Sequence, residues 1–427
     1  MTFRRFSTVL VVVTILFGST QVENLSAAGI GQSCPKVAAT ATIKLKGKNT
    51  KILCVKTGGI SRWQVPVSAM RTDSSITPLA KLSSPNVCQI TDATPGEMSS
   101  GFPRSAGLVP SSGKLKILVI PVIFSDLEFT DSDLGYVKNK YQKVAEYFNE
   151  SSYGVATVEA TYADKDSWVN LGTSLEQNGF INAPVQTNRV LFYRNVIDLY
   201  ESKKSLAGYD IVEVVTSNTN LFDVGYGFTP GESQYGTKRT FGGVLSTGAA
   251  VFAWDTLAHE LGHAWLGFED LYFFATSLEV RAGFPVIGAW DLMGRINSQQ
   301  RELSGWSRWL AGWIASSSVR CVESSSSSRH FLEPLAAKQT STSSKVLVFK
   351  LTANSAIVIE YRAESKYNET SSKLLVYKVD TTYSHGQGPM RLVAEIGKVG
   401  TAVSSDTIKI TLLKIDSTGV VVSIDPA

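Results

Sequence analysis

The stretch HELGH, from His259 to His263, restricts the possible folds of this 427-residue chain more than any other segment. Residues around it repeat at helical spacing and are apolar, namely Val251, Phe252, Trp254, Leu257, Ala258 and Leu261. The pattern predicts a helix that is largely buried. A buried helix that displays two histidines and a glutamate needs partners for these polar groups, and a bound metal ion provides them. The fold must therefore enclose this helix and bring a further ligand to it.

The spacing within HELGH suits a zinc site. Residues four apart lie on one helix face, so His259 and His263 can bind the same ion. Glu260 lies about 100° further around the helix, where it can reach a water at the metal but cannot be a ligand. This placement predicts Glu260 as the general base of a hydrolytic reaction. The pattern is short and also occurs by chance, in which case the two histidines are ordinary core residues.

A catalytic zinc ion usually has three protein ligands, so a third ligand must come from outside the helix. Gly267 can adopt a positive φ and end the helix, and two carboxylates follow it directly. Glu269 and Asp270 are therefore both candidates for the third ligand. Weaker candidates lie far along the chain: Asp380, His330 and His385. The two distant histidines are expected at the surface of the C-terminal part.

The segments before the helix predict an α+β fold. Apolar runs at 114–124 and 209–217 predict buried strands, and helical patterns at 134–148 and 185–200 alternate with them. This alternation favours a mixed sheet with helices packed on it. The glycine-rich residues 224–248 predict either a cleft-lining loop followed by a short edge strand, GGVLST, or an ordinary irregular loop. A strand at the edge of a sheet can pair with an extended peptide.

The chain divides into five predicted parts. These are a signal peptide at 1–28, a small basic β module at 29–67, a linker and lead-in segment at 68–113, a catalytic domain at 114–323 and a C-terminal β-sandwich-like domain at 324–427. Two arginines, a short apolar run and a small-residue site are typical of a cleaved secretory signal. The apolar run is shorter than the roughly 20 residues that span a bilayer. No later stretch is long and apolar enough to span one either.

Four cysteines remain after cleavage of the predicted signal: Cys34, Cys54, Cys88 and Cys321. An even number in an exported chain favours disulfides over free thiols, and three pairings are possible. Cys34–Cys54 with Cys88–Cys321 is favoured because it needs no crossing between the parts. A zinc ribbon is disfavoured because the chain has no CxxC pair.

The distribution of charged residues disfavours nucleic acid as a partner but leaves other partners open. The formal net charge is +4, from 41 Lys and Arg against 37 Asp and Glu, and no block is basic enough to predict nucleic acid binding. The module at 29–67 holds seven Lys or Arg between Lys36 and Arg62. It is either a solvated β-hairpin clipped by a disulfide or a contact site for an anionic polymer of the cell envelope.

The stretch HELGHAWLGFEDLY, from His259 to Tyr272, resembles the pattern HExxHxxGxxD followed by Leu-Tyr of the immune inhibitor A family of secreted bacterial metallopeptidases, which belong to the metzincins. GAWDLMG at 288–294 is similar to the methionine-containing turn of that family, and ELSGWSRWLAGWI at 302–314 is similar to the helix and Gly-Trp that follow it. VIEYR and VYKVD resemble the family's C-terminal β region. The resemblance covers roughly residues 100–400 and leaves out the basic module.

The resemblance implies a zincin-like catalytic domain, with a twisted mixed sheet and an active-site helix. It implies one catalytic Zn²⁺ held by His259 and His263, with Glu260 as base and Met293 as a hydrophobic floor that does not ligate. Gly267 lies one residue further from His263 than the family pattern has it. One residue inserted before the glycine leaves Gly-x-x-Asp-Leu-Tyr intact, which favours Asp270 as third ligand and leaves Glu269 as the alternative. A structural Ca²⁺ has no assigned site.

These observations favour a secreted or cell-surface zinc endopeptidase that hydrolyses protein or peptide substrates. The alternative is a catalytically weak or inactive zincin scaffold that binds an extracellular surface or matrix. A third hypothesis, hydrolysis of a non-peptide bond, rests only on the generality of zinc chemistry.

Overall fold

The computed structural model describes residues 30, 32–45, 48–57, 60–93, 96–178, 185–217, 225–230, 242–249, 253–274, 286–296, 301–323, 326–370, 372–383 and 386–427. The chain forms two compact units, Met1–Pro66 and Val67–Ala427, and each is described by itself. The predicted signal peptide lies outside the described residues. Within the described part, no helix has the length and apolar character needed to cross a membrane.

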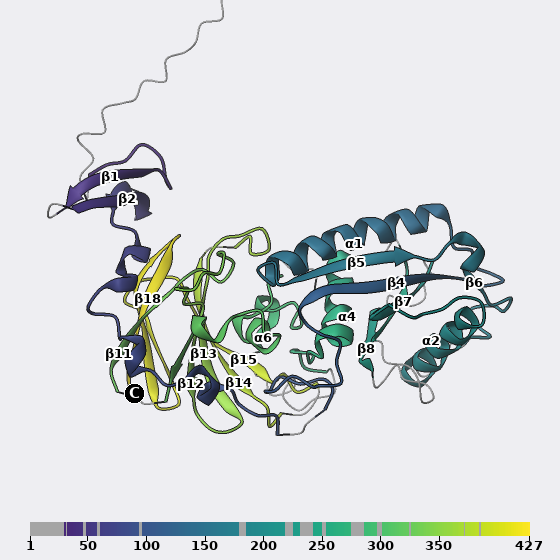
Figure 1. The fold of residues 1–427 in the computed structure, drawn as a ribbon. Coiled ribbons are helices and arrows are strands. Elements are labelled where there is room, and N and C mark those ends of the chain that lie inside the picture. The colour runs from purple at the N-terminus through teal and green to yellow at the C-terminus, as the bar shows by residue number, and fades with distance from the viewer. Residues whose placement is uncertain are drawn as a thin grey trace, which may run out of the picture. The chain divides into compact units, whose positions relative to one another are not determined.

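The first unit is a three-stranded antiparallel sheet of β1 (Thr40–Leu45), β2 (Lys48–Thr57) and β3 (Ile60–Gln64) (Figure 1). Its small core contains Ala41, Ile52, Cys54 and Trp63. A disulfide joins Cys34 to Cys54, the local pairing that the sequence favours.

The second unit begins with a mixed sheet in the order β5-β4-β7-β9-β8, with β6 beside β4. The strands are β4 (Gly113–Ile123), β5 (Ala156–Tyr162), β6 (Val169–Asn170), β7 (Ile211–Thr216), β8 (Gly225–Phe228) and β9 (Gly242–Thr247). All of these pair in parallel except β8, which runs antiparallel to β9. Strands β7 and β9 are buried along their whole length, as expected for inner strands covered on both faces.

Helices cover both faces of this sheet. The α-helices are α1 (Asp131–Ser151), α2 (Val185–Glu201), α4 (Trp254–Leu266) and α6 (Gly305–Leu310). The 3₁₀ helices are η2 (Val67–Thr72), η3 (Leu79–Lys81), η4 (Pro85–Cys88), η5 (Lys165–Ser167), η6 (Gly288–Trp290) and η7 (Ser316–Ser318). Figure 1 shows α1 lying along the sheet, with α4 close to it. Successive residues of a strand point to opposite faces, so Gly227 of β8 packs on α4 while the Phe228 ring packs at a tilt against Tyr193 of α2.

The predicted edge strand GGVLST is not at the edge. It forms β9, which lies between β7 and β8, and the glycine-rich GYGF of β8 takes the outer position instead. Strand β8 has only four residues. Its sequence alternates glycine with aromatic residues because α4 approaches closely on one face, where Gly225 and Gly227 leave room for it.

The C-terminal part contains two further sheets, in the orders β10-β12-β13-β14-β15 and β11-β18-β17-β16. Their strands are β10 (Val319–Val322), β11 (Ser328–Leu332), β12 (Val346–Lys350), β13 (Ser355–Arg362), β14 (Lys373–Asp380), β15 (Met390–Ile396), β16 (Ala402–Ser405), β17 (Ile408–Asp416) and β18 (Gly419–Pro426). Apolar residues from both sheets, such as Ile359 and Val422, join one core. The two sheets therefore share one apolar core.

The catalytic and C-terminal parts do not have separate interiors. Val358 of β13 and Tyr377 of β14 belong to the same core cluster as Leu261 of α4. Residues 68–113, predicted as a linker and lead-in segment, belong to this compact unit. The Cys88–Cys321 disulfide attaches them to β10, and the Ser99 N–H donates to the carbonyl of Gly267 at 2.9 Å.

Candidate metal centre

Helix α4 carries the predicted site and is buried from Asp255 to Leu266. It continues one residue beyond the position at which the family pattern places its glycine, and Gly267 ends it with φ of 66°. A Cβ at Gly267 would also lie 2.5 Å from the carbonyl oxygen of Glu97, so only glycine fits. The Gly267 N–H donates to the carbonyls of both Gly262 and His263. The helix thus ends in a widened last turn.

The turn at Gly267 brings Asp270 back to the two histidines. The Oδ1 atom of Asp270 lies 3.2 Å from Nε2 of His259 and 3.2 Å from Nε2 of His263, and the two Nε2 atoms are 3.2 Å apart. Among the described residues, these three form the one group whose donor atoms all lie close enough to hold a single metal ion. All three side chains are buried.

A hydrogen bond at Nδ1 determines which nitrogen of each neutral imidazole carries the proton. His259 Nδ1 lies 3.1 Å from the carbonyl oxygen of Leu292, and His263 Nδ1 lies 2.7 Å from that of Phe268. A carbonyl oxygen only accepts, so each Nδ1 carries the proton. In the neutral rings each Nε2 then presents a lone pair toward the Asp270 carboxylate. Three acceptors meet at one buried point, which requires a cation between them.

In the metal-free protein, protons on the histidines supply the positive charge between these acceptors. Burial opposes the charged form of His263, but the negative charge of Asp270 and their hydrogen bond outweigh it and raise the pKa of His263 to about 9. Burial also opposes the charged form of Asp270. The charge of His263 and hydrogen bonds from both histidines hold the pKa of Asp270 far below its usual range. The residues present therefore fit a divalent cation.

Glu260 is nearly buried and packs against the edge strand β8. A Cβ on Gly225 would lie 2.6 Å from both Cγ and Oε1 of Glu260. Gly227 meets the helix itself, because a Cβ there would lie 2.2 Å from the Glu260 carbonyl oxygen and 2.8 Å from Cβ of His263. Two glycines spaced by one residue therefore let β8 lie directly on helix α4.

The turn around Met293 lies under the helix. A Cβ on Gly262 would be 2.5 Å from Sδ of Met293, so this side chain fills the space between the two histidines on the helix surface. The N–H of Leu271 donates to the Met293 carbonyl at 3.0 Å. Asp291 stabilises the turn by accepting from the Met293 N–H at 2.9 Å and the Ser304 N–H at 2.7 Å. The turn therefore contacts the helix and the segment that carries Asp270.

A buried ionic network, which the sequence did not indicate, connects this turn to the C-terminal sheet. Arg362 of β13 has no exposed surface, and its Nη2 donates to the carbonyl of Trp290 at 2.7 Å. Its other nitrogens contact Glu302 Oε2 at 3.1 Å and Glu360 Oε1 at 2.5 Å. Glu360 also accepts from the N–H of Gly305, the first residue of α6, at 2.6 Å.

Tyr272 is a further site residue that motif reasoning did not single out, although it is part of the quoted Asp-Leu-Tyr. Its ring stacks on that of His259, with centroids 6.4 Å apart and planes at 22°. It is 36% exposed, so it lies at the surface of the site. Burial raises the pKa of Tyr272, and the charge of Asp270 and a hydrogen bond to it raise the pKa further. The phenol therefore stays protonated and can donate.

The remaining candidates lie elsewhere. Glu269 is not part of the three-residue group and lines a small cavity with Ser99 and Ser100. Asp380 accepts from Thr382 at the end of β14. His330 lies in β11 and is buried, whereas the sequence predicts it at the surface. Its ring contacts Ser328 Oγ at 2.9 Å. Burial lowers the pKa of His330 to about 4. His385 lies outside the described residues.

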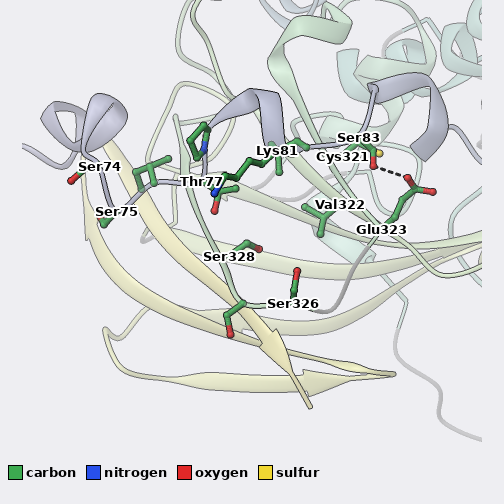
Figure 2. A pocket seen from close by; sticks show the side chains of 14 residues that line it. Ser74, Ser75, Thr77, Lys81, Ser83, Cys321, Val322, Glu323, Ser326 and Ser328 are labelled. Carbon is green, nitrogen blue, oxygen red and sulfur yellow. Dashed lines mark hydrogen bonds between the residues drawn. The ribbon is translucent and has the colours of Figure 1, made fainter.

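A separate polar groove of about 710 Å³ lies on the C-terminal part (Figure 2). Residues 74–78 and 81–83 form one side, and residues 321–323 and 326–328 form the other. Figure 2 shows the hydrogen bond from Ser83 to Glu323, 2.6 Å long, at one end of it. None of the predicted metal or base residues lines this groove.

Comparisons with known proteins add little to this geometry. No protein-family model matches the sequence, and no curated protein matches it. Among solved structures, the chain is similar to the crystal structure of metalloproteinase-II from Bacteroides fragilis, with 14% sequence identity, 66% of this chain and 78% of that chain covered, and a TM-score of 0.31. A similarity of this size does not establish a shared fold, so the function must be argued from the site.

Proposed function

We propose that this protein is a secreted zinc-dependent endopeptidase of the metzincin type. The observation that carries the proposal is the meeting of two imidazole lone pairs and one carboxylate oxygen, 3.2 Å from one another, beside a glutamate on the same helix. Two histidines and one carboxylate are a ligand set of catalytic zinc sites. The resemblance to the immune inhibitor A family supports the same activity.

His259, His263 and Asp270 are the proposed ligands. A zinc ion bound there supplies a Lewis acid and lowers the pKa of a water molecule. Glu260 takes the proton from the attacking water and returns it to the leaving amine. Tyr272, at the exposed side of the site, donates a hydrogen bond to the oxygen on which negative charge develops. Met293 packs against the helix and holds the two histidines in place without ligating.

The edge strand supports a peptide as substrate. Strand β8 pairs with β9 on one side, and within the described ranges it is the last strand of this sheet. Its backbone groups there can pair with an extended chain, as in β-strand addition. Because Gly225 contacts Glu260, a peptide bound along β8 passes close to the base.

The first test is metal content and cleavage by the purified protein. We expect one zinc per chain and cleavage of an unfolded protein, with Glu260→Gln keeping its zinc and losing at least about 100-fold in rate. Similar two-histidine, one-carboxylate sets bind Fe(II), so iron in place of zinc would contradict the proposal. Full activity of Glu260→Gln would also contradict the assigned base.

A matched pair of variants tests the third ligand. Asp270→Asn is expected to lose zinc, whereas Glu269→Gln, the neighbouring and equivalent change, is expected to keep it. The reverse result would assign Glu269. If zinc-loaded protein cleaves neither unfolded proteins nor a peptide library, the inactive-scaffold alternative replaces the peptidase.

A further inference from the structure

Residues 97–110, which the sequence predicts as part of a linker, lie against the C-terminal end of α4. The indole N–H of Trp265, in the last turn of the helix, donates to the carbonyl of Pro110 at 2.8 Å. The N–H of Ser99 donates to the carbonyl of Gly267, directly after the helix, at 2.9 Å. The end of the helix that carries both histidines is therefore held by a segment from much earlier in the chain.

One side chain of this segment supplies hydrogen bonds that the helix itself cannot make. An α-helix leaves its last four carbonyl groups without a partner inside the helix, and in α4 these include the carbonyls of Trp265 and Leu266, two buried residues. Arg104 Nε donates to the Leu266 carbonyl at 3.0 Å, and its Nη2 donates to the Trp265 carbonyl at 2.5 Å. The same Nη2 atom lies 2.5 Å from the Val109 carbonyl, which fixes the guanidinium from the other side.

The charge of Arg104 suits this position. Its hydrogen bonds in the described part all go to backbone carbonyls rather than to a carboxylate. A cation at the C-terminus of a helix is favoured by the partial negative charge of the last carbonyls. Burial lowers the pKa of Arg104 to about 10, so the side chain is still charged at neutral pH. The planar guanidinium can also bond two carbonyls at once in a fixed geometry, which an ammonium group cannot.

The turn that Arg104 contacts leads directly to the ligands. Leu266 is the last residue of α4. Two residues later, the carbonyl of Phe268 accepts from Nδ1 of His263 at 2.7 Å, and Asp270 follows two residues after that. A change in the orientation of the Leu266 peptide would therefore move the hydrogen-bond partner of one proposed ligand and the whole of another.

We propose that Arg104 is a positioning residue of the metal centre, which holds the last turn of α4 in the form that brings Asp270 to the two histidines. It acts through the backbone and not by contact with the ligands. The inference rests on the ligand set of the proposed function, but it does not require that the protein cleaves peptides.

The zinc affinity of the full chain, measured by chelator competition, tests this role. Arg104→Met should bind zinc about 10–100-fold more weakly, as is typical when a group that orients a ligand is lost. Arg104→Lys keeps the cation without the planar fork, and its affinity should lie between the two. The matched control is Arg320→Met. Arg320 is also half-buried and donates to backbone carbonyls, those of Ser317 at 2.8 Å and Ser343 at 3.2 Å, but it lies in β10, outside the metal centre. The control should keep the affinity of the unaltered protein.

Hydrogen exchange of the metal-free protein provides a second measurement. The amides of Gly267 and Phe268 donate to carbonyls of the last turn, so Arg104→Met should raise their exchange rates at least about tenfold, and Arg320→Met should not. If Arg104→Met does not fold, Arg104→Lys carries the test, and full zinc affinity of that variant would then overturn the proposal.

Unchanged zinc affinity of a folded Arg104→Met would overturn the assigned role. An equal loss in Arg104→Met and Arg320→Met would also overturn it, because the loss would then reflect general stability. A loss confined to the Arg104 variants, in a protein that cleaves no peptide, would support the positioning role and refute only the peptidase function. No zinc binding by the unaltered protein would overturn both.

Discussion

Zinc binding to this centre is expected to depend steeply on pH between about 7 and 9. The negative charge of Asp270 raises the pKa of His263 to about 9 in the metal-free protein, against the effect of burial. A zinc ligand must be a neutral imidazole, so zinc has to displace this proton. At pH 7, two units below that pKa, about 1% of His263 is neutral, and the apparent affinity is about 100-fold below its alkaline limit. Affinity should therefore rise about tenfold for each pH unit up to 9.

The pair of His263 and Asp270 also stabilises the fold of the metal-free protein, and this contribution falls as the pH rises. The folded-state pKa of His263 is above its ordinary value of 6.5, so the protonated pair stabilises the fold fully below pH 6.5. That contribution is lost as the pH rises through about 9. At 1.36 kcal/mol for each unit of pKa, the loss amounts to about 3 kcal/mol.

A chelator competition titration between pH 6.5 and 9.5 measures the affinity, and urea unfolding of the metal-free protein measures the stability. Asp270→Asn is the control for the stability measurement. It removes the carboxylate, so the pKa of His263 should fall and the loss of stability toward pH 9 should disappear. An affinity that does not change with pH would refute the assigned proton. A stability profile that Asp270→Asn leaves unchanged would refute the assigned partner.

Three further variants test the surroundings of the centre. Gly225→Ala should displace Glu260, since the added Cβ would lie 2.6 Å from its Oε1. The variant should keep its zinc content and lose at least about tenfold in kcat/KM. Full activity of the variant would show that Glu260 has room to move. Tyr272→Phe should lower kcat about 100-fold with little change in KM, measured by steady-state peptide cleavage, and an effect on KM alone would exclude a role in stabilising the reacting oxygen. Arg362→Met should cost about 3–5 kcal/mol in urea unfolding, because it leaves Glu302 and Glu360 buried without their cation, and a loss below 1 kcal/mol would contradict that pairing.

The local part of the site could be predicted from the sequence. The spacing of His259 and His263 fixes their common face as soon as the segment is helical, and the apolar residues around them make it helical. The candidate for the third ligand was harder to predict, because the position of its side chain depends on backbone dihedral angles rather than on residue spacing. The left-handed Gly267 and the wide last turn decide that Asp270, and not Glu269, faces the histidines.

Features that depend on long-range pairing could not be predicted. Strand β8 is four residues of alternating glycine and aromatic residues, a pattern without the β-branched content of a typical strand. Its place at the edge follows from its fit against α4, which no local rule contains. In the same way, the β-type composition of β13 predicts a strand but not that Glu360 and Arg362 are completely buried.

The buried network explains why the predicted division at residue 323 does not separate two independent domains. Arg362 and Glu360 of the C-terminal sheet bind the Trp290 carbonyl and the Gly305 N–H, which lie on either side of the Asp291–Met293 turn. A buried ion pair of this kind adds little net stability compared with apolar packing. Its hydrogen bonds nevertheless hold the backbone on both sides of the turn. The geometry it fixes is that of the turn that contacts His259 and Gly262. The C-terminal sheet is thus part of the support of the metal centre and not an appended module.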